Sequence, residues 1–434
     1  MRAPVCREGL SIEGLLHEAR RVFARIPDSP NNDIPLVDHL MAGLAVFGLK
    51  YSSLLQFDHD REDATVRANL KALYGIERAP CDTRFRERLD TVDPAQLRPL
   101  YTALFRRLQR GKGLEGFAYL DGHYLLSLDG TGYFSSNTVH CPQCAEKHHR
   151  NGTTTYYHQM LGAVLVHPDC QEVFPLAPEP IRKPDGARKN DCERNAAKRL
   201  LSALRREHPH LKLIVIEDAL ASNGPHIRHL QALDLRFILG AKPSDHTFLF
   251  DWVGRSEQTA EVTFTDASGL RHRFRYLNGV PLNDANFDLE VNFLEYWEQA
   301  PDGTAQHFSW VTDIPITDHN LMILMRGARA RWKIENETFN TLKNQGYHFE
   351  HNFGHGNQHL STVLMHLMML AFLIDQIQQR CCRLFQAAVT AAKSKTRLWR
   401  KLRHRFDLCL IPSWEVLYQS IIHPPQLALG HDTS

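Results

Sequence analysis

Three acidic residues stand at positions where a carboxylate is costly to bury unless it is paired or holds a cation. Asp129 follows the strand-like run HYLLSL, Asp218 ends the apolar run LKLIVIE, and Glu335 lies in a helical stretch further along the chain. An isolated carboxylate at the end of a buried strand loses its hydration, so it needs a positive partner. Three converging carboxylates would bind Mg²⁺ or Mn²⁺, which activate water and stabilise the leaving oxygen of a phosphodiester. We therefore expect Asp129, Asp218 and Glu335 to be metal ligands and catalytic residues.

Each of these acids also has an ordinary structural interpretation. Asp129 precedes Gly-Thr-Gly and could form a turn, Asp218 could simply end a strand, and Glu335 could pair with Arg331 one helical turn earlier. Glu337 is the rival for the catalytic glutamate, because residues two apart on a helix point about 200° away from each other. Arg331 lies four residues before Glu335 and favours that residue. The order strand-Asp, buried-strand-Asp, helix-Glu favours the metal site over three unrelated structural roles.

The segments around these acids predict an α/β core with a mixed sheet. The runs HYLLSLDGTGYF, TTYYHQMLGAVLVHP and EVFPLAP are typical of strands, DCERNAAKRLLSALRREHP of a helix, and LKLIVIEDA of a strand buried on both faces. We expect five consecutive parts. They are a helical, candidate DNA-end-binding region in 1–115, the first part of the core in 116–239, a β-rich insertion in 240–316, the catalytic-Glu helix and the rest of the core in 317–380, and a basic helical region in 381–434.

The string RWKIENETFNTLKNQG resembles the catalytic-helix signature of DDE transposases of bacterial insertion sequences, in particular the insertion-sequence-four-type superfamily. The residues that match this signature are Arg331, Trp332, Ile334 and Glu335. LSLDGT and IVIEDA resemble the two strands that carry the family's aspartates, at Asp129 and Asp218. The family also has a β insertion between its second aspartate and its glutamate. The resemblance covers roughly residues 120–375.

This resemblance implies a fold and an activity. The fold is an RNase H-like catalytic core with a β-stranded insertion, flanked by N-terminal and C-terminal helical regions. The activity is DNA cleavage at insertion-sequence ends followed by strand transfer, with transposon ends and target DNA as partners and a homodimer on paired ends. It implies a bacterial cytoplasmic protein that is associated with the nucleoid when bound to DNA. The alternatives are an RNase H-like metal-dependent nuclease without strand transfer and a non-catalytic DNA-binding relic of a transposase.

The chain also departs from the family pattern. The family often has a tyrosine where Ala328 stands, and its lysine falls seven residues after the glutamate, whereas Lys343 comes eight after Glu335. A local irregularity of the helix would restore that spacing. We expect DNA binding by the residues Arg331, Lys343, Arg106, Arg107, Arg182 and Lys183. The basic tract Lys393–Arg405 is either a solvated helix face or a further phosphate-binding surface.

A second group of residues has the types that bind zinc. In HCPQCAEKHH, Cys141 and Cys144 are spaced for one tetrahedral ion, and His148 and His149 are nearby histidines that could complete a structural Zn²⁺ site. Other candidates for the remaining ligand are His140, His158 and Cys170. The alternative is a reduced turn with two bystander thiols.

A histidine cluster follows the catalytic-helix signature. In YHFEHNFGHGNQH these residues are His348, His351, His355 and His359. Their spacing matches no metal motif, so we expect polar contacts with a DNA backbone. The alternative is a structural loop whose polar groups are satisfied within the protein.

Composition excludes several classes of protein. The 434 residues are 43% hydrophobic and 23% charged, which excludes wholesale disorder. With 51 Lys and Arg against 49 Asp and Glu, a nucleic-acid surface must come from local segregation of charge. Nine cysteines without a framework spacing predict reduced thiols in a cytosol. The apolar run Leu360–Ile374 contains His366 and is shorter than a spanning helix, so we expect a buried core helix and no membrane partner.

Overall fold

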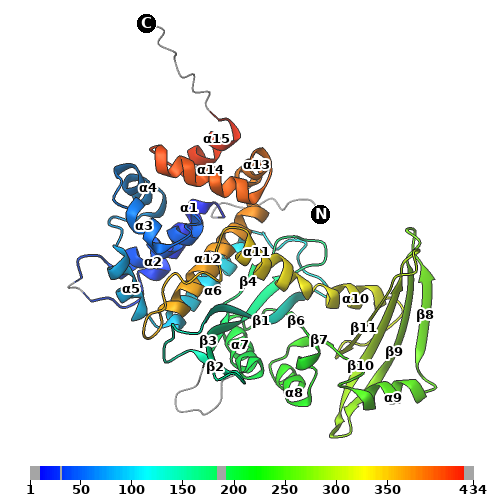
Figure 1. Ribbon diagram of the computed structural model, residues 1–434. Helices are drawn as coiled ribbons and strands as arrows, with labels where there is room; N and C mark the ends of the chain where they lie inside the picture. The colour runs from blue at the N-terminus through cyan, green and yellow to red at the C-terminus, as the bar shows by residue number, and fades with distance from the viewer. Residues whose placement is uncertain (1–9, 30–31, 183–191, 425–434) are drawn as a thin grey trace. The chain divides into compact units, whose positions relative to one another are not determined.

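The computed structural model describes residues 10–29, 32–182 and 192–424, and Figure 1 shows its elements. These residues group into two compact units. Unit 1 contains Glu115–Gly132 and Gln159–Phe339; unit 2 contains the described residues up to Leu114, Tyr133–His158, and those from Asn340 on. Each unit is therefore built from segments that are distant in sequence. The five-part division expected from the sequence stays a prediction.

Unit 1 is built on a mixed sheet whose strand order is β3-β1-β6-β7-β11-β10-β9-β8. The strands of its core are β1 (Tyr124–Ser136), β3 (Thr154–Val166), β6 (Leu213–Glu217) and β7 (Arg236–Gly240). β1, β6 and β7 are parallel neighbours, and all five residues of β6 are buried, as expected of the run LKLIVIE. Short β4 (Phe174–Pro175) and β5 (Glu179–Ile181) pair antiparallel with β3.

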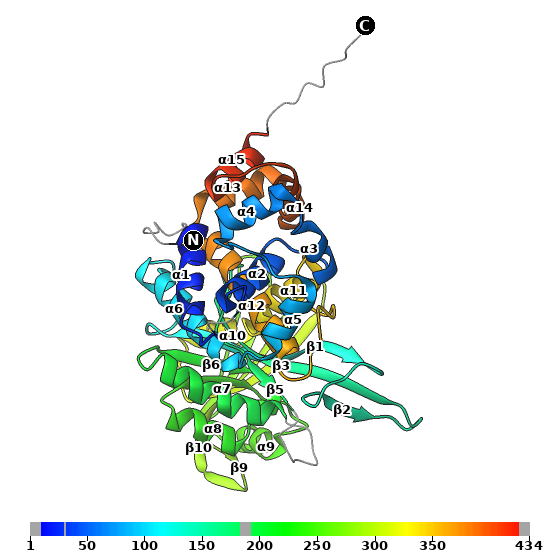
Figure 2. The same cartoon turned by 90° about the vertical axis from the view of Figure 1, so that its left-hand side faces the viewer.

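Helices follow the core strands of unit 1. α7 (Glu193–Glu207) packs its alanines Ala196 and Ala197 into a buried cluster with β3 and β5. α8 (Gly224–Ala232), which links β6 to β7 after the short η2 (Ala219–Ala221), lies beside α7, as Figure 2 shows. The two helices are joined where Arg205 donates to the carbonyl of Leu233 at 2.8 Å. Together they fix the start of α7 beside the end of β6.

The predicted β-stranded insertion is present and extends the core sheet. Its strands are β8 (Ala260–Thr265), β9 (Arg271–Asn283), β10 (Asn286–Gln299) and β11 (Ala305–Thr312), preceded by α9 (Thr247–Arg255). All four are antiparallel to their neighbours, and β11 pairs with β7. Asp266 forms the β8–β9 turn by accepting from the backbone N–H groups of Ser268 and Leu270. The α/β class predicted from the sequence is confirmed.

Two local features differ from the expectation. The DGTG segment is not a turn: β1 runs through Asp129 without a break to Ser136. The stretch expected to be one helix is interrupted: α10 (Leu321–Arg329) ends before a π-helix, η3 (Ile334–Phe339), which leads into α11 (Asn340–Asn344). π-Helical turns are rare and occur frequently at functional sites, which draws attention to Glu335.

Unit 2 is mainly helical. Its first helices are α1 (Ile12–Phe23), α2 (Leu36–Gly48), α3 (Leu54–Asp60), α4 (Ala64–Tyr74), α5 (Asp82–Asp90), η1 (Pro94–Leu97) and α6 (Arg98–Arg110). Its last helices are α12 (Leu360–Cys381), α13 (Arg383–Ala392), α14 (Lys395–Leu408) and α15 (Trp414–Ile422). A short strand, β2 (Ala145–His148), pairs with the first residues of β3.

The long helix α12 is the centre of unit 2. Among the described helices it alone is long and apolar enough to cross a membrane by length and composition, and 94% of its apolar window is buried inside the protein. It packs against α2, α5 and α6. His366 on this helix is buried and meets Tyr101, whose hydroxyl donates to the His366 carbonyl at 3.0 Å. The expectation of a buried core helix is confirmed.

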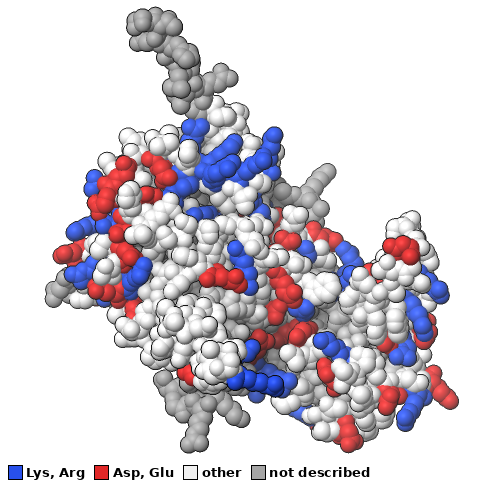
Figure 3. Space-filling view, in the orientation of Figure 1, with Lys and Arg blue, Asp and Glu red and all other residues white. Residues whose placement is uncertain are grey.

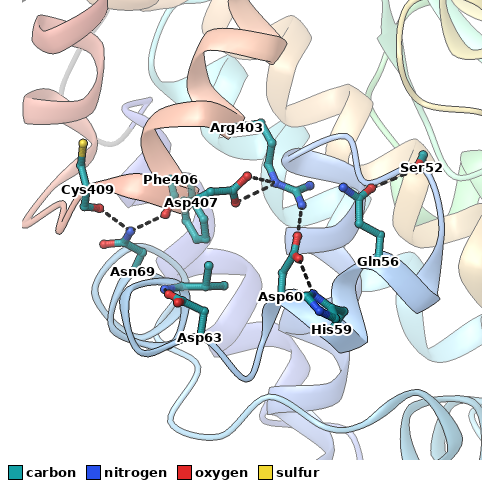
Figure 4. Close-up of polar contacts among 11 residues, drawn as sticks. Ser52, Gln56, His59, Asp60, Asp63, Asn69, Arg403, Phe406, Asp407 and Cys409 are labelled. Atoms are coloured by element: carbon teal, nitrogen blue, oxygen red, sulfur yellow. Dashed lines mark hydrogen bonds and ion pairs between the residues drawn. The ribbon is translucent and has the colours of Figure 1, made fainter.

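α14 is attached to unit 2 by side chains of its own basic tract (Figure 4). Arg403 forms ion pairs with Asp60 at 2.5 Å and Asp407 at 3.0 Å, and its guanidinium lies over the ring of Tyr51. Asn69 of α4 donates to the carbonyl of Phe406 at 2.7 Å. Arg403 therefore has a structural role, whereas other basic residues of α14 are exposed.

Candidate functional site

Asp129 and Glu335 lie against each other in unit 1, with Arg331 between them. One guanidinium nitrogen of Arg331, Nη1, is 3.5 Å from Asp129 Oδ2 and 2.8 Å from Glu335 Oε1. The backbone carbonyl of Arg331 accepts a hydrogen bond from Ser127 Oγ at 3.1 Å, which attaches this segment to β1. The ion pair between Arg331 and Glu335, one helical turn apart, is thus present. Arg331 also pairs with Asp129 of β1, so the pair is part of a group of three charged residues.

Burial makes the carboxyl of Asp129 a weak acid. It raises the pKa of Asp129 to about 7; the neighbouring charge of Glu335 adds to this increase, and the Arg331 guanidinium opposes it. A second positive charge at this point would therefore be strongly favoured, because two carboxylates in close contact repel each other when both are ionised. A carboxyl whose pKa is strongly raised by burial beside a specific charge, as that of Asp129 is, is common at catalytic sites.

Asp129 and Asp218 line one cavity of about 580 Å³ in unit 1. Asp218 follows β6 directly, and β6 is the parallel neighbour of β1. In the parallel register of β1 and β6, Ser127 lies opposite Ile216, so Asp129 and Asp218, each two residues further on, reach the same cavity although they are nearly 90 residues apart. Asp218 also accepts from the backbone N–H of Leu220 at 3.0 Å, so its role as the cap of η2 is compatible with facing the cavity. A group of acidic side chains is visible over β1 and β6 in Figure 3.

Glu193, at the start of α7, is a further acid of this cavity that the sequence did not single out. Its carboxyl lies so close to β1 that a Cβ at Gly130 would come within 2.2 Å of Glu193 Oε1. Partial desolvation, with the negative charges of Asp218 and Glu217, raises its pKa. Gly130 therefore leaves room for a carboxylate beside Asp129, which explains a glycine inside a strand.

A buried pair closes the far side of the cavity. Glu217 is the last residue of β6, and its Oε2 lies 2.6 Å from Nε2 of His226 on α8. Burial lowers the pKa of His226, but the charge and hydrogen bond of Glu217 outweigh it, so the net shift is upward. Glu217 is therefore paired with a histidine of the same cavity, and the other described acids that line the cavity are Asp129, Asp218 and Glu193.

The π-helix η3 positions Glu335. Two of its apolar residues pack on β3 at Gly162, where an added Cβ would meet Phe339 at 3.1 Å and Ile334 at 3.4 Å. Lys333 donates to the carbonyl of Cys170 at 2.7 Å and holds the turn before it. This close packing fixes the side of the helix that carries Glu335.

The other expected DNA-binding residues lie elsewhere. Arg107 forms an ion pair with Glu18 at 2.8 Å in unit 2, where Arg106 is exposed, and Arg182 is half-buried at the end of β5 in unit 1. Lys183 lies outside the described residues. Their roles stay predictions.

Lys343 follows an irregular segment of helix, of the kind that the family pattern requires for its eight-residue spacing from Glu335. The π-helix η3 separates Glu335 from α11, which carries Lys343. Within unit 2, Lys343 pairs with Glu350 at 2.8 Å. A phosphate-binding role for Lys343 stays a prediction.

The cysteine pair meets histidines other than the two expected. In unit 2, the side chains of Cys141 and Cys144 gather with His158 of β3 and His355 of the segment between α11 and α12. His148 and His149 instead bond to the hydroxyls of two threonines across the β2–β3 hairpin, at 3.0 and 2.8 Å. Neither histidine belongs to the described group of four, and a ligand role for His148 and His149 stays a prediction.

Comparisons with known proteins include a distant likeness to a solved structure. No protein-family model matches the chain, and no curated protein matches it. Among solved structures, a piggyBac transposase synaptic complex with hairpin DNA is 8% identical, with a TM-score of 0.40, covering 97% of this chain and 80% of that chain. It is a distant structural neighbour of this chain.

The residues that sequence reasoning missed are Glu193 and, as a member of the cysteine cluster, His355. The signal for Glu193 was the DGTG glycine, whose reason is the close approach of a carboxylate. No spacing pointed to His355, which lies 211 residues after Cys144. Both depend on contacts between distant segments.

Proposed function

We propose that the protein is a DDE-type transposase whose unit 1 cleaves DNA phosphodiesters and transfers the freed strand. The observation that supports this most directly is the contact of Asp129 and Glu335 through Arg331, beside a cavity that Asp218 also lines. One acid each thus comes from the strand β1, from the residue after its parallel neighbour β6, and from the later helix η3. The RNase H-like arrangement inferred from the resemblance has the same order.

The donor set fits Mg²⁺ or Mn²⁺. All the candidate ligands are carboxylates, which hard divalent cations prefer, and Mg²⁺ is ordinarily bound by few carboxylates plus water and substrate phosphate. Asp129, Asp218 and Glu335 would hold the ions, with Glu193 as a fourth acid at the same cavity. When bound, such ions activate the attacking oxygen and stabilise the leaving one.

The chain's own residues have distinct tasks in this proposal. Arg331 carries a permanent positive charge between two acids, so it orients both and can bind a non-bridging phosphate oxygen. Gly130 keeps the approach to Asp129 open for Glu193. The buried Glu217–His226 pair forms a rigid wall behind Asp218. Chemistry at phosphorus needs positioning and charge neutralisation more than a side-chain nucleophile.

DNA would be bound by basic side chains outside the acidic cavity. α14 has an exposed basic face with Arg397, Arg400 and Lys401, and Figure 3 shows Lys and Arg side chains gathered over this helix. Such a face binds phosphates without reading sequence. Pairing of two DNA ends by a homodimer and a bacterial cytoplasmic location remain parts of this proposal.

The test uses the full-length chain with Mg²⁺ or Mn²⁺ and labelled duplexes that tile the DNA on both sides of its gene. We expect cleavage at a defined position, and joining of a precut 3′ end to a supercoiled plasmid. Asp129→Asn, Asp218→Asn and Glu335→Gln should each reduce cleavage about 100-fold or more, because each removes transition-state stabilisation. Glu337→Gln, on the same helix, is the matched control and should remain active.

The outcomes separate the candidate functions. Cleavage without joining would replace the transposase by a metal-dependent nuclease. DNA binding that is unchanged in all four variants, with no cleavage by the wild type, would show a non-catalytic relic. Loss of cleavage in Glu337→Gln but not in Glu335→Gln would overturn the assignment of the glutamate.

A further inference from the structure

Four metal-ligating side chains of unit 2 form a cluster that includes none of the three acids. They are Cys141 and Cys144 from the loop between β1 and β2, His158 from β3, and His355 from the segment between α11 and α12. Their ligand atoms all lie within 4.8 Å of one another. The cysteines and His158 are buried, with at most 8% of each residue exposed.

The distances between these atoms match a tetrahedral zinc site. Zn–S bonds of about 2.3 Å and Zn–N bonds of about 2.0–2.1 Å place two sulfurs about 3.8 Å apart and a sulfur about 3.5 Å from a nitrogen. The two sulfurs here are 3.9 Å apart. Nε2 of His158 is 3.5 Å from each sulfur, and Nε2 of His355 is 3.4 Å from Cys144 Sγ.

The surroundings aim the imidazoles at the sulfurs. The ring of His158 stacks on Tyr133 at 5.6 Å between centroids, and the ring of His355 lies 4.3 Å from that of Phe134. These aromatic contacts leave each Nε2 facing the cysteine pair. The Cys-x-x-Cys loop is closed by the N–H of Cys144 donating to the carbonyl of Cys141 at 3.1 Å. The packing of the protein itself therefore places these ligand atoms in this geometry.

We propose that Cys141, Cys144, His158 and His355 bind one structural zinc ion. Two thiolates and two imidazoles in a tetrahedral, closed arrangement select zinc over hard cations such as Mg²⁺. The ion joins the Cys-x-x-Cys loop, β3 and the segment 345–359, which otherwise has little regular structure. Its function is to stabilise that segment, which also contains Glu350, the ion-pair partner of Lys343 on α11.

The first measurement is the metal content of the full-length chain, purified without added metal, by mass spectrometry of the elements. We expect about one zinc per chain. Replacement by Co²⁺ should give the strong visible absorption of a tetrahedral site with thiolate ligands. Wild-type chain without zinc and without this Co²⁺ spectrum, or with a disulfide between Cys141 and Cys144, would overturn the proposal.

Variants then assign the ligands. Cys144→Ser and His355→Ala should lose zinc, whereas His148→Ala and His149→Ala, which alter an exposed and a half-buried histidine of the same region, should keep it. Retention of zinc in His355→Ala together with loss in His148→Ala would reject the ligand set. If a ligand variant fails to fold, the zinc content and the Co²⁺ spectrum of the wild-type chain still test the proposal.

The last measurement tests the role of the ion in the wild-type chain. Chelation should speed hydrogen exchange in residues 345–359 but not in the β8–β11 strands, and added Zn²⁺ should reverse it. Unchanged exchange there would reject the stabilising role. All of these readouts are independent of DNA cleavage, so they stand or fall separately from the proposed function.

Discussion

At the scale of single residues, the carboxylates of Asp129 and Glu335 repel each other, and the guanidinium of Arg331 reduces this repulsion. Asp129 is partly buried beside Glu335, and Arg331 offers both a positive charge at ion-pair distance. A site optimised for stability alone would not place two acids in contact. This cost in stability is typical of functional sites, where local rules are broken for chemistry.

The pH dependence of stability follows from the raised pKa of Asp129. With its pKa at about 7 in the folded chain and about 3.9 unfolded, the folded state holds an extra proton between these values, so stability falls as pH rises through that window. Asp129→Asn removes this titrating carboxyl, and with it the change in protonation on unfolding. In a chelator, we expect its melting temperature to exceed that of the wild type more at about pH 8 than at about pH 5. An equal difference at both pH values would contradict the burial of this acid.

At the scale of elements, helix ends carry much of the order of unit 2. The carboxylate of Asp90, at the end of α5, accepts backbone N–H groups from residues 357–360 at the start of α12, at 2.9–3.0 Å. Desolvation acts against the charged form, but these four N–H groups lower the pKa of Asp90 overall. A negative charge at a helix N-terminus is favourable because the N–H groups there have no partner within the helix.

Asp90→Ala should therefore loosen the start of the central helix. We expect a loss of about 1.5–3 kcal/mol in the free energy of unfolding, since the hydrogen bonds involve a charged acceptor. Because the folded pKa is lowered, the stabilisation is present above about pH 4 and is lost as pH falls through the folded pKa. Urea unfolding at about pH 7 and about pH 3 measures both effects. A difference between wild type and variant that is as large at the lower pH would contradict this role.

At the scale of the whole molecule, charge is segregated although the net charge is only +2. The acids gather at the cavity of unit 1, and an exposed basic face lies on α14 of unit 2. The basic tract Lys393–Arg405 is divided: Arg403 points into the protein and pairs with Asp60, whereas Arg400 is exposed. The net charge of the whole chain does not show this separation of acidic and basic side chains.

A charge-neutralising variant of α14 tests the exposed face as a DNA surface. Arg397→Gln, Arg400→Gln and Lys401→Gln combined should weaken binding to a plain duplex and reduce the slope of log affinity against log salt by about 2 to 3. Their melting temperature should stay unchanged. Arg403→Gln is the control and should lower the melting temperature, because it leaves Asp60 and Asp407 without their cation. An unchanged salt slope in the triple variant would exclude this face.

The sequence by itself determined the α/β class, the buried strand before Asp218, the β-stranded insertion and the buried helix that contains His366. These follow from local periodicity and composition, which act within one element. It also indicated the three acids and the cysteine pair, because their residue types at strand ends and in a Cys-x-x-Cys loop have few ordinary uses.

Only the tertiary structure decided which side chains meet. The register of β1 beside β6, the start of α7 against Gly130, and the π-helix before Lys343 are set by packing between segments far apart in the chain. For the same reason the cysteine pair meets His355, 211 residues after Cys144, and not the histidines four and five residues away. Local spacing cannot encode such contacts, since a strand pairing that turns a side chain outward overrides its nearness in sequence.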